Sequence, residues 1–384
     1  RTQGPGFGCE QTDMEDPTID LNNTNKNFVS INLKNEEGMK FMKKLLADAD
    51  IFVNNLRDKA LNKMGLDYET LHKEFPTLIW AQMRGYGEYG PEKDSPGFDA
   101  VCWAARGGVA NVFREDGESP AIAPQAFGDY NVGHMLATGI VSALFNRTRT
   151  GKGEKVVTNL YAGAIWGGNI GICATQFGAP YPKSRKHVPN PFNNTYRTYD
   201  DKWIYICMPQ YDKYYPMMMG LFGHEDQIEN PDTNNLTSLK ASGKNVEVID
   251  WLEKAFAKKT FDEWMAIFKE NEVPAQKCFR YTDVVKDEEA YDNDALRMVE
   301  YEAYGKRALP MTPVRFGSYG DPPVVLSKPI GYHTAEFMHD YGYSDEEIAK
   351  IAEDGGVVVY DGPEIEDRIF VSKRQAAGEA PCNW

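Results

Sequence analysis

The stretch Glu36–Asn54 reads EEGMKFMKKLLADADIFVN, and its pattern decides the fold class. Its apolar residues recur at helical spacing up to Ala49, and the run Ile51–Asn54 is then apolar like a buried strand. The same order returns in Tyr68–Phe75, which is predicted helical, and in Thr77–Met83, which is predicted to be a strand. Strands and helices that alternate at this interval indicate an α/β protein with a mostly parallel sheet covered by helices.

Size and composition indicate a globular protein. The 384 residues, of which 42% are apolar, suffice for two domains or one large α/β body. No run of eighteen apolar residues occurs, so we expect no membrane span.

The histidines have no metal-ligand spacing, and we expect no metal site. The cysteines have no paired spacing either, which favours a reducing cytoplasm. They are Cys9, Cys102, Cys173, Cys207, Cys278 and Cys382.

The net charge of -15 argues against nucleic acid or an anionic membrane as a partner, because both require a surplus of Lys and Arg. A small phosphorylated ligand needs only local basic groups. The chain concentrates such groups at Arg57, Lys59 and Lys63, and again in the segment 183–187.

Composition also divides the chain into parts. From Pro180 onward Pro, Asn, Lys and Tyr become frequent, and Asn190–Asn194 is the least regular segment, so we expect a domain boundary nearby. The expected parts are an irregular N-terminal arm (1–24), the first part of a Rossmann-like large domain (25–180), a smaller α+β domain with linkers (181–295), a return to the large domain (296–352) and an acidic, solvated C-terminal extension (353–384). The chain opens without an initiator Met and without a secretory signal, so we expect removed residues or a partial sequence.

Further elements are predicted from periodicity and capping signals. They are helices at 132–146, 162–177, 214–221 and 246–258, helices that begin at Thr260 and Ser344, and strands at 27–33, 155–158 and 202–208.

The best candidate for chemistry is Phe127–Gly133, because it places one carboxylate, Asp129, between small residues just before a long apolar helix. One interpretation is that Asp129 is only the N-cap of that helix. The other uses the same geometry. Backbone N–H groups and the positive end of the helix would keep the carboxylate ionised, and small neighbours would let a substrate thioester approach closely. The Asp129 carboxylate could then act as a nucleophile.

Other motifs are weaker taken alone. Gly85-Tyr86-Gly87 closes a predicted strand, where ligands bind in open α/β sheets, but a plain turn is equally consistent. Asn54–Arg57 closes another strand before the basic residues, which are either phosphate ligands or a solvated face. Gly151 and Gly153 precede a strand and predict a tight turn. A Gly-x-Ser-x-Gly elbow and a P-loop are both missing from the sequence.

Taken together, the motifs resemble the family III CoA-transferases of the CaiB/BaiF type, from about Asn25 to Ile351. The segments that carry the resemblance are Asn25-Lys26 with the strand to Leu33-Lys34, Ala49–Asn55, Met64-Gly65-Leu66, Gly85-Tyr86-Gly87, Pro96-Gly97-Phe98-Asp99, Phe127-Gly128-Asp129 and Thr150–Glu154. The segment from Pro182 to Tyr196 is most similar to the branch that acts on 2-hydroxy acids of amino-acid fermentation, such as 2-hydroxyisocaproate or phenyllactate.

The resemblance implies a transferase in which Asp129 becomes an aspartyl-CoA thioester, with acyl-CoA as a substrate and no tightly bound cofactor. It also implies an interlaced homodimer. By position in the family's motifs, the residues expected to contact CoA are Ile31, Asn32, Leu33, Lys34, Asn55, Leu56, Arg57, Lys63, Met64, Pro96, Gly97, Phe98 and Asp99. Lys63 stands where the family often has Arg, so the charge is kept and the bidentate fork is lost.

The sequence departs from the family pattern in two places. The family begins with a strand, helix and strand that this sequence lacks, which bears on the sheet and on the adenine end of the CoA site. The racemase branch tends to carry acids after the equivalent of Gly153, whereas Val157 and Ala162 stand here. Transfer is therefore favoured, and two alternatives stay open: an acyl-CoA racemase or isomerase of the same fold, and a non-catalytic acyl-CoA-binding protein.

Overall fold

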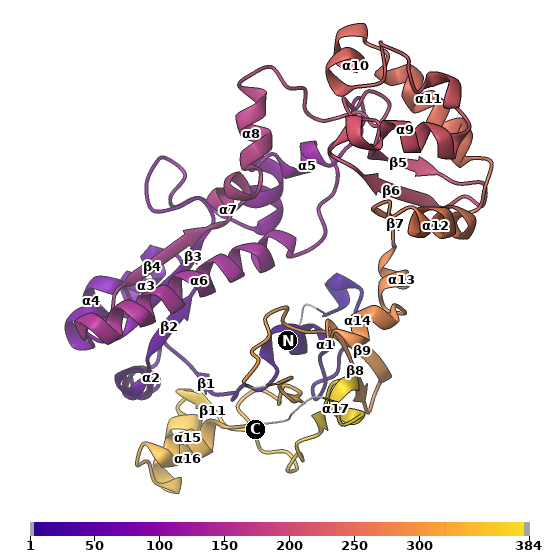
Figure 1. The fold of residues 1–384 in the computed structure, drawn as a ribbon. Coiled ribbons are helices and arrows are strands. Elements are labelled where there is room, and N and C mark those ends of the chain that lie inside the picture. The colour runs from indigo at the N-terminus through magenta and orange to yellow at the C-terminus, as the bar shows by residue number, and fades with distance from the viewer. Residues whose placement is uncertain (1–3, 319, 380–384) are drawn as a thin grey trace. The chain divides into compact units, whose positions relative to one another are not determined.

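The computed structural model describes residues 4–318 and 320–379, and they form two compact units (Figure 1). The large unit comprises the described parts of 1–103, 125–163 and 282–384, and the small unit comprises 104–124 and 164–281. The first three residues and Cys382, which figure in the sequence analysis, lie outside the described residues. No helix among the described residues is long and apolar enough to cross a membrane.

The large unit is built on a parallel sheet in which β3 (Ile79–Arg84) lies between β2 (Ile51–Asn54) and β4 (Lys155–Asn159). Ile51 pairs with Ile79 on one side, and on the other side Trp80 pairs with Lys155. Since both neighbours run parallel to β3, all three strands end at the same edge of the sheet. The predicted parallel sheet is confirmed.

Helices cover both faces of this sheet. On one face α2 (Glu36–Asp48), α3 (Asp58–Met64) and α4 (Tyr68–Glu74) bury Leu46, Leu61 and Leu71 against Trp80. Each of these leucines gains about 1.5–3 kcal/mol by leaving water.

The opposite face is covered by α6 (Phe127–Thr150), which is longer than the predicted 132–146. Val157 packs with the first group of helices, while Val156 next to it contacts Gly139 of α6. Neighbouring strand residues point to opposite faces, so α6 lies on the other side of the sheet.

The other elements of the large unit form short antiparallel pairs with helices around them. They are α1 (Pro17–Asn23), β1 (Ser30–Ile31), α14 (Glu288–Asp292), β8 (Leu296–Tyr301), β9 (Gly305–Pro310), β10 (Val324–Val325), α15 (Thr334–Asp340), α16 (Asp345–Glu353), β11 (Val357–Val358), β12 (Ile369–Phe370) and α17 (Lys373–Ala376), besides a 3₁₀ turn at Gly4–Phe7. The pairs are β1 with β11, β8 with β9, and β10 with β12. Ser344 caps α16 with the predicted capping box.

Both ends of the described chain differ from expectation. The N-terminal arm is not irregular throughout, because Asp16 caps α1 and the buried Asp20 accepts hydrogen bonds from the Tyr301 hydroxyl (2.9 Å) and the Ser327 amide (2.7 Å). The expected solvated extension contains β11 and β12, which pair with β1 and β10. The Asp20 side chain therefore holds the N-terminal arm to distant segments, and backbone pairing holds the C-terminal part.

The small unit is an antiparallel sheet of β5 (Asn193–Arg197), β6 (Trp203–Cys207) and β7 (Ala275–Lys277) with helices on one face. The helices on that face are α9 (Tyr211–Phe222), α10 (Leu236–Ser242), α11 (Asn245–Phe256) and α12 (Phe261–Glu270), which Thr260 caps as predicted. The unit also contains α5 (Val109–Val112) and α8 (Asn169–Thr175).

The boundaries of the small unit differ from the expected 181–295. The predicted helix 162–177 is interrupted at Gly168, so α7 (Leu160–Gly167) and α8 are separate helices. The division between the two units falls within α7, and the segment 104–124 also joins the small unit. The amino-acid composition changes only at Pro180, whereas the chain begins to pack with the small unit already at Ala164.

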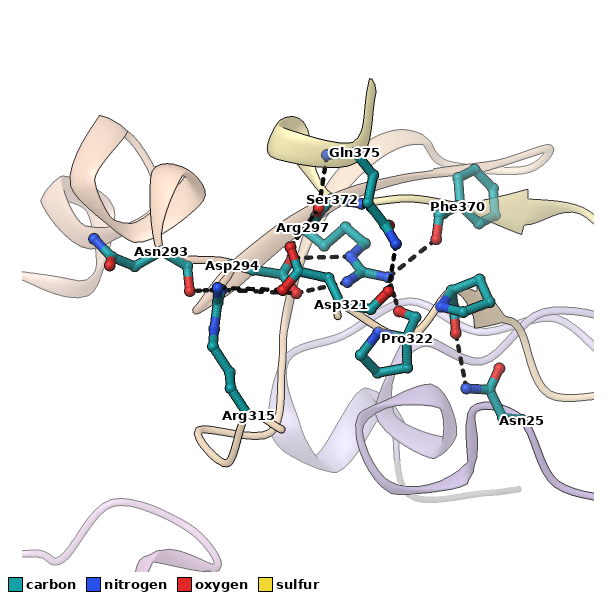
Figure 2. A network of polar contacts seen from close by, with 11 residues as sticks. Asn25, Asn293, Asp294, Arg297, Arg315, Asp321, Pro322, Phe370, Ser372 and Gln375 are labelled. Carbon is teal, nitrogen blue, oxygen red and sulfur yellow. Dashed lines mark hydrogen bonds and ion pairs between the residues drawn. The ribbon is translucent and has the colours of Figure 1, made fainter. Parts of the chain in front are cut away.

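A buried ion pair organises the C-terminal part of the large unit (Figure 2). The Arg297 side chain is 1% exposed and donates from Nε to Asp294 Oδ1 (3.0 Å) and from Nη2 to Asp294 Oδ2 (2.6 Å). Its Nη1 donates to the carbonyls of Pro322 (2.5 Å) and Phe370 (3.1 Å). One side chain therefore joins β8, the segment before β10, and β12.

We predict that Arg297→Met destabilises the protein by about 3–5 kcal/mol, because it leaves the Asp294 charge buried and unpaired. Urea unfolding of the purified variant measures the loss. Arg197→Met is the matched control: its ion pair with Asp201 is exposed, so we expect little change. Equal midpoints for the two variants would contradict this role for Arg297.

Candidate active site

Asp129 lies in the first turn of α6, at the edge where the parallel strands end. The helix begins at Phe127, directly after Ala126, whose φ of 57° turns the chain sharply into the helix. Asp129 is therefore the third helical residue, and the interpretation of Asp129 as the N-cap is wrong. The positive end of the helix still surrounds it.

Gly128 is held in a space that admits no side chain. Its N–H donates to Asp99 Oδ2 (3.2 Å). A Cβ at this position would lie 2.2 Å from Asp99 Oδ1 and 2.4 Å from Cγ of Trp103. The glycine before Asp129 is thus required for the close approach of the Asp99 loop to α6.

The Asp99 loop is itself anchored at the end of β3. A Cβ on Gly85 would lie 3.0 Å from the Cα of Gly97 and 3.0 Å from Sγ of Cys102, which is fully buried. The amides of Val101 and Cys102 donate to the Phe98 carbonyl and close the next turn. The close contact of Gly85 with Gly97 and Cys102 holds Asp99 against the helix that carries Asp129.

The Asp129 carboxylate is exposed, but the surrounding protein removes part of its hydration. This desolvation raises the pKa of Asp129, and the negative charge of Asp99 raises it further. No described residue donates a hydrogen bond to this carboxylate. The expected hold by backbone N–H groups is thus not present; Asp129 is an accessible carboxylate of raised basicity.

A groove of about 740 Å³ runs along α2 and α3, and four of the residues expected to contact CoA line it: Leu33, Lys34, Lys63 and Met64. Met39 and Ala60 add apolar surface, and Lys40 and Lys43 add charge. Lys40 pairs with Glu36 and Glu37, and Lys43 pairs with Glu74. Among the described residues, Lys34 and Lys63 have no carboxylate partner, so their charges are available to a ligand.

A second group, Asn55, Leu56 and Arg57, follows β2 at the same edge of the sheet. Buried Gln82 of β3 donates to the Leu56 carbonyl (2.7 Å), and Arg84 donates to both carboxylate oxygens of Asp58 (2.8 and 2.9 Å). This network holds the loop. Sequence analysis missed it, although polar Gln82 in an otherwise apolar strand was a signal.

The remaining expected residues have different positions. Ile31 pairs with Val357 in the β1–β11 ladder, and Asn32 donates to the Gly355 carbonyl (2.9 Å), so both have structural contacts. Pro96, Gly97 and Phe98 lie in the loop after β3 beside Asp99. The thirteen predicted positions thus fall into four sets within the large unit: the groove residues, Asn55–Arg57, Ile31 with Asn32, and Pro96–Asp99.

The small unit has a hollow of its own, of about 490 Å³, on the uncovered face of its sheet. Arg114 and Lys183 supply positive charge, the Arg185 guanidinium is paired with Glu253, and Phe113 and Tyr205 supply aromatic surface. Glu115 is engaged by Ser184 and the Arg185 amide, whereas Nε of Arg114 is buried without a hydrogen-bond partner. This hollow suits a carboxylate that carries an apolar group.

Within the described ranges, no three His, Cys, Asp or Glu side chains gather as metal ligands would. The arrangement around Asp129 instead suits covalent chemistry at an accessible carboxylate.

Comparison with known proteins agrees with this geometry. The family model described as CoA-transferase family III matches residues 1–334. Cinnamoyl-CoA:phenyllactate CoA-transferase of Clostridium sporogenes is 39% identical over 94% of this chain and 88% of its own length. (R)-2-hydroxy-4-methylpentanoate CoA-transferase of Clostridioides difficile is 38% identical over 94% and 90%. The crystal structure of Rv3272 from Mycobacterium tuberculosis has a TM-score of 0.69 at 26% identity and covers 83% of this chain and 82% of that one.

We predict that Gly128→Ala lowers the stability of the protein by about 1–3 kcal/mol, because the added methyl group must displace Asp99 or Trp103. Gly133→Ala in the same helix is the matched control. A Cβ there meets nothing within 4 Å, so we expect a gain of roughly 0.5–1 kcal/mol. Thermal unfolding distinguishes them, and a Gly128→Ala protein as stable as the wild type would refute the close approach.

Proposed function

Because this chain belongs to the family III CoA-transferases, we propose that it moves CoA from an acyl-CoA to a 2-hydroxy acid through a covalent intermediate on Asp129. The observation that carries the proposal is the Asp129 carboxylate itself: exposed, free of hydrogen bonds from described residues, and next to a glycine. A nucleophile must reach a thioester carbonyl, and few carboxylates of the large unit combine access with raised basicity.

The proposed reaction divides the transfer into acyl exchanges of similar energy. The Asp129 carboxylate attacks the donor thioester, and CoA thiolate leaves, which forms a mixed anhydride. The thiolate then attacks the aspartyl carbonyl and releases the donor as a free carboxylate, which leaves an aspartyl-CoA thioester. The acceptor carboxylate reverses both steps. The positive end of α6 stabilises the negative charge that develops on oxygen during each attack.

The groove along α2 and α3 fits the nucleotide part of CoA. Lys34 and Lys63 carry charges that no described carboxylate neutralises, which suits phosphate groups. Leu33, Met39 and Met64 provide an adaptable apolar wall for a planar base. We place the rest of the CoA molecule along Asn55–Arg57 and Pro96–Asp99. Both segments lie at the edge of the sheet where the strands end, next to the first turn of α6 with Asp129.

The acid substrates are inferred from the relatives and from the small unit. Both relatives are named for 2-hydroxy acids with a bulky apolar side chain, phenyllactate and 2-hydroxy-4-methylpentanoate. The hollow of the small unit combines cations with Phe113 and Tyr205, which matches a carboxylate with such a side chain.

We also propose a homodimer. Large apolar side chains remain exposed on both units: Val141 and Phe145 on the outer side of α6, and Trp166, Ile170 and Phe177 along α7, α8 and the turn that follows. Exposed large apolar side chains of this kind are typical of an interface between subunits.

We predict that Asp129→Ala and Asp129→Asn abolish CoA exchange while the proteins remain folded, because the side chain is exposed and contributes no hydrogen bond to the fold. Intact-mass measurement after incubation with cinnamoyl-CoA or a 2-hydroxyacyl-CoA detects the adduct, and hydroxylamine should release it. Wild type should gain the mass of CoA on the peptide that holds Asp129. Retained turnover in either variant would refute the mechanism, and solvent deuterium at the α-carbon without an acceptor acid would indicate a racemase.

We predict that Lys34→Met and Lys63→Met each raise KM for the acyl-CoA roughly tenfold with little change in kcat, because a phosphate contact binds substrate and transition state equally. The effect should shrink at high salt. Lys73→Met on α4 removes an exposed lysine outside the groove and should leave KM unchanged. Steady-state kinetics in acyl-CoA measures the difference, and an unchanged KM in both groove variants would place the phosphates elsewhere.

A further inference from the structure

Asp99 has two oxygens in different situations. Oδ2 accepts the Gly128 N–H at 3.2 Å, while Oδ1 is buried without a hydrogen-bond partner. Oδ1 also lies so close to Gly128 that a Cβ there would be 2.2 Å away. An ionised oxygen that is neither hydrated nor hydrogen-bonded is costly, so the fold maintains this carboxylate against α6 at an energetic expense.

The side chain next to this contact is Asp129. Asp99 thus holds a negative charge beside the first turn of the helix that carries the nucleophile. Burial raises the pKa of Asp99, and the charge of Asp99 contributes to raising the pKa of Asp129. Two carboxylates that repel each other gain when either becomes neutral.

Acylation neutralises Asp129 just as protonation does. In the overall half-reaction, the enzyme carboxylate and the acyl-CoA thioester give an aspartyl-CoA thioester and a free carboxylate anion. The C–S bond of the donor and one C–O bond of the Asp129 carboxyl break, a C–S bond to the aspartyl carbonyl and a C–O bond to the donor acyl carbon form, and the negative charge leaves on the released acid. The repulsion from Asp99 is present before the reaction and absent after it.

We propose that Asp99 is a positioning residue whose hydrogen bond to Gly128 fixes the first turn of α6 and whose charge favours the acylated form of Asp129 over the free carboxylate. This inference rests on the proposed covalent mechanism. It assigns Asp99 a role toward the nucleophile rather than only toward CoA.

Few other titratable groups act at this position. On α6, Tyr130 and His134 follow Asp129; the Tyr130 hydroxyl accepts a hydrogen bond from Asn22 (3.0 Å), and His134 Nδ1 lies 2.8 Å from the Tyr130 carbonyl. Across the contact, Trp103 and Gly128 are uncharged. Among the described residues, Asp99 is the titratable group whose charge acts on the Asp129 carboxyl.

Asp99→Asn tests the proposal, because an amide oxygen can still accept the Gly128 N–H while the charge is lost. Titration of the Asp129 carboxyl by ¹³C NMR in the free protein should show a lower pKa than in wild type. The sign follows from the loss of repulsion: ionised Asp129 becomes more stable, so the acid limb of kcat/KM should move to lower pH. Asp94→Asn, an exposed change of the same charge in the preceding loop, should leave both unchanged.

The second readout is the fraction of aspartyl-CoA at a fixed ratio of acyl-CoA to free acid, measured by intact mass. In Asp99→Asn the acylation equilibrium constant should fall by the factor by which the acid dissociation constant of Asp129 rises. A merely structural role would not couple these two numbers. Should the variant fold poorly, Asp99→Ser serves instead, because a hydroxyl oxygen can also accept a hydrogen bond and carries no charge, and the pKa of Asp129 should again be lower than in wild type.

The outcomes separate the two proposals. A wild-type adduct that forms equally in Asp99→Asn, with the titration of Asp129 unchanged, would overturn the role of Asp99 and leave the covalent mechanism intact. A wild type that forms no adduct with any donor would overturn the proposed function, and the role of Asp99 with it.

Discussion

The parallel pairing of β3 with both β2 and β4 is the constraint on which the large unit depends. Because the three strands run in one direction, their carboxyl ends open at one edge, and the loops that follow them meet there. The loop after β2 carries Asn55–Arg57, and the loop after β3 carries Asp99. With α6 packed on one face, its first turn reaches the same edge, so the direction of the strands places Asp129, the proposed nucleophile, there.

Glycine is what permits the close contacts at that edge. Gly85 and Gly97 let two segments of backbone touch beside Cys102, and Gly128 lets Asp99 lie against α6. Each of these contacts joins segments that are distant in sequence. The geometry of the site therefore depends on glycines, which let the backbone segments approach closely. Asp99 and Asp129 are held there by packing more than by hydrogen bonds.

The charges of Asp99 and Asp129 are arranged in a way that does not stabilise the fold. Elsewhere in the large unit the buried carboxylate of Asp294 is paired with Arg297. At the site, two carboxylates lie near each other and one oxygen of Asp99 has no partner. Such repulsion costs folding energy, and the acylation of Asp129 in the proposed mechanism would relieve it.

The sequence by itself determined the fold class, the parallel sheet and the segment that holds Asp129, because periodicity and turn residues act over a few neighbouring positions. It also identified the N-cap at Thr260 and the capping box at Ser344. It failed where partners are distant: the strands at 357–358 and 369–370 are too short to recognise without their pairs, and the division between the units falls within α7 instead of at Pro180. Only the tertiary structure decided that Asp129 is a helical residue to which no described residue donates a hydrogen bond, and that Asp99 lies against the same helix turn, because burial and charge depend on which segments meet in space.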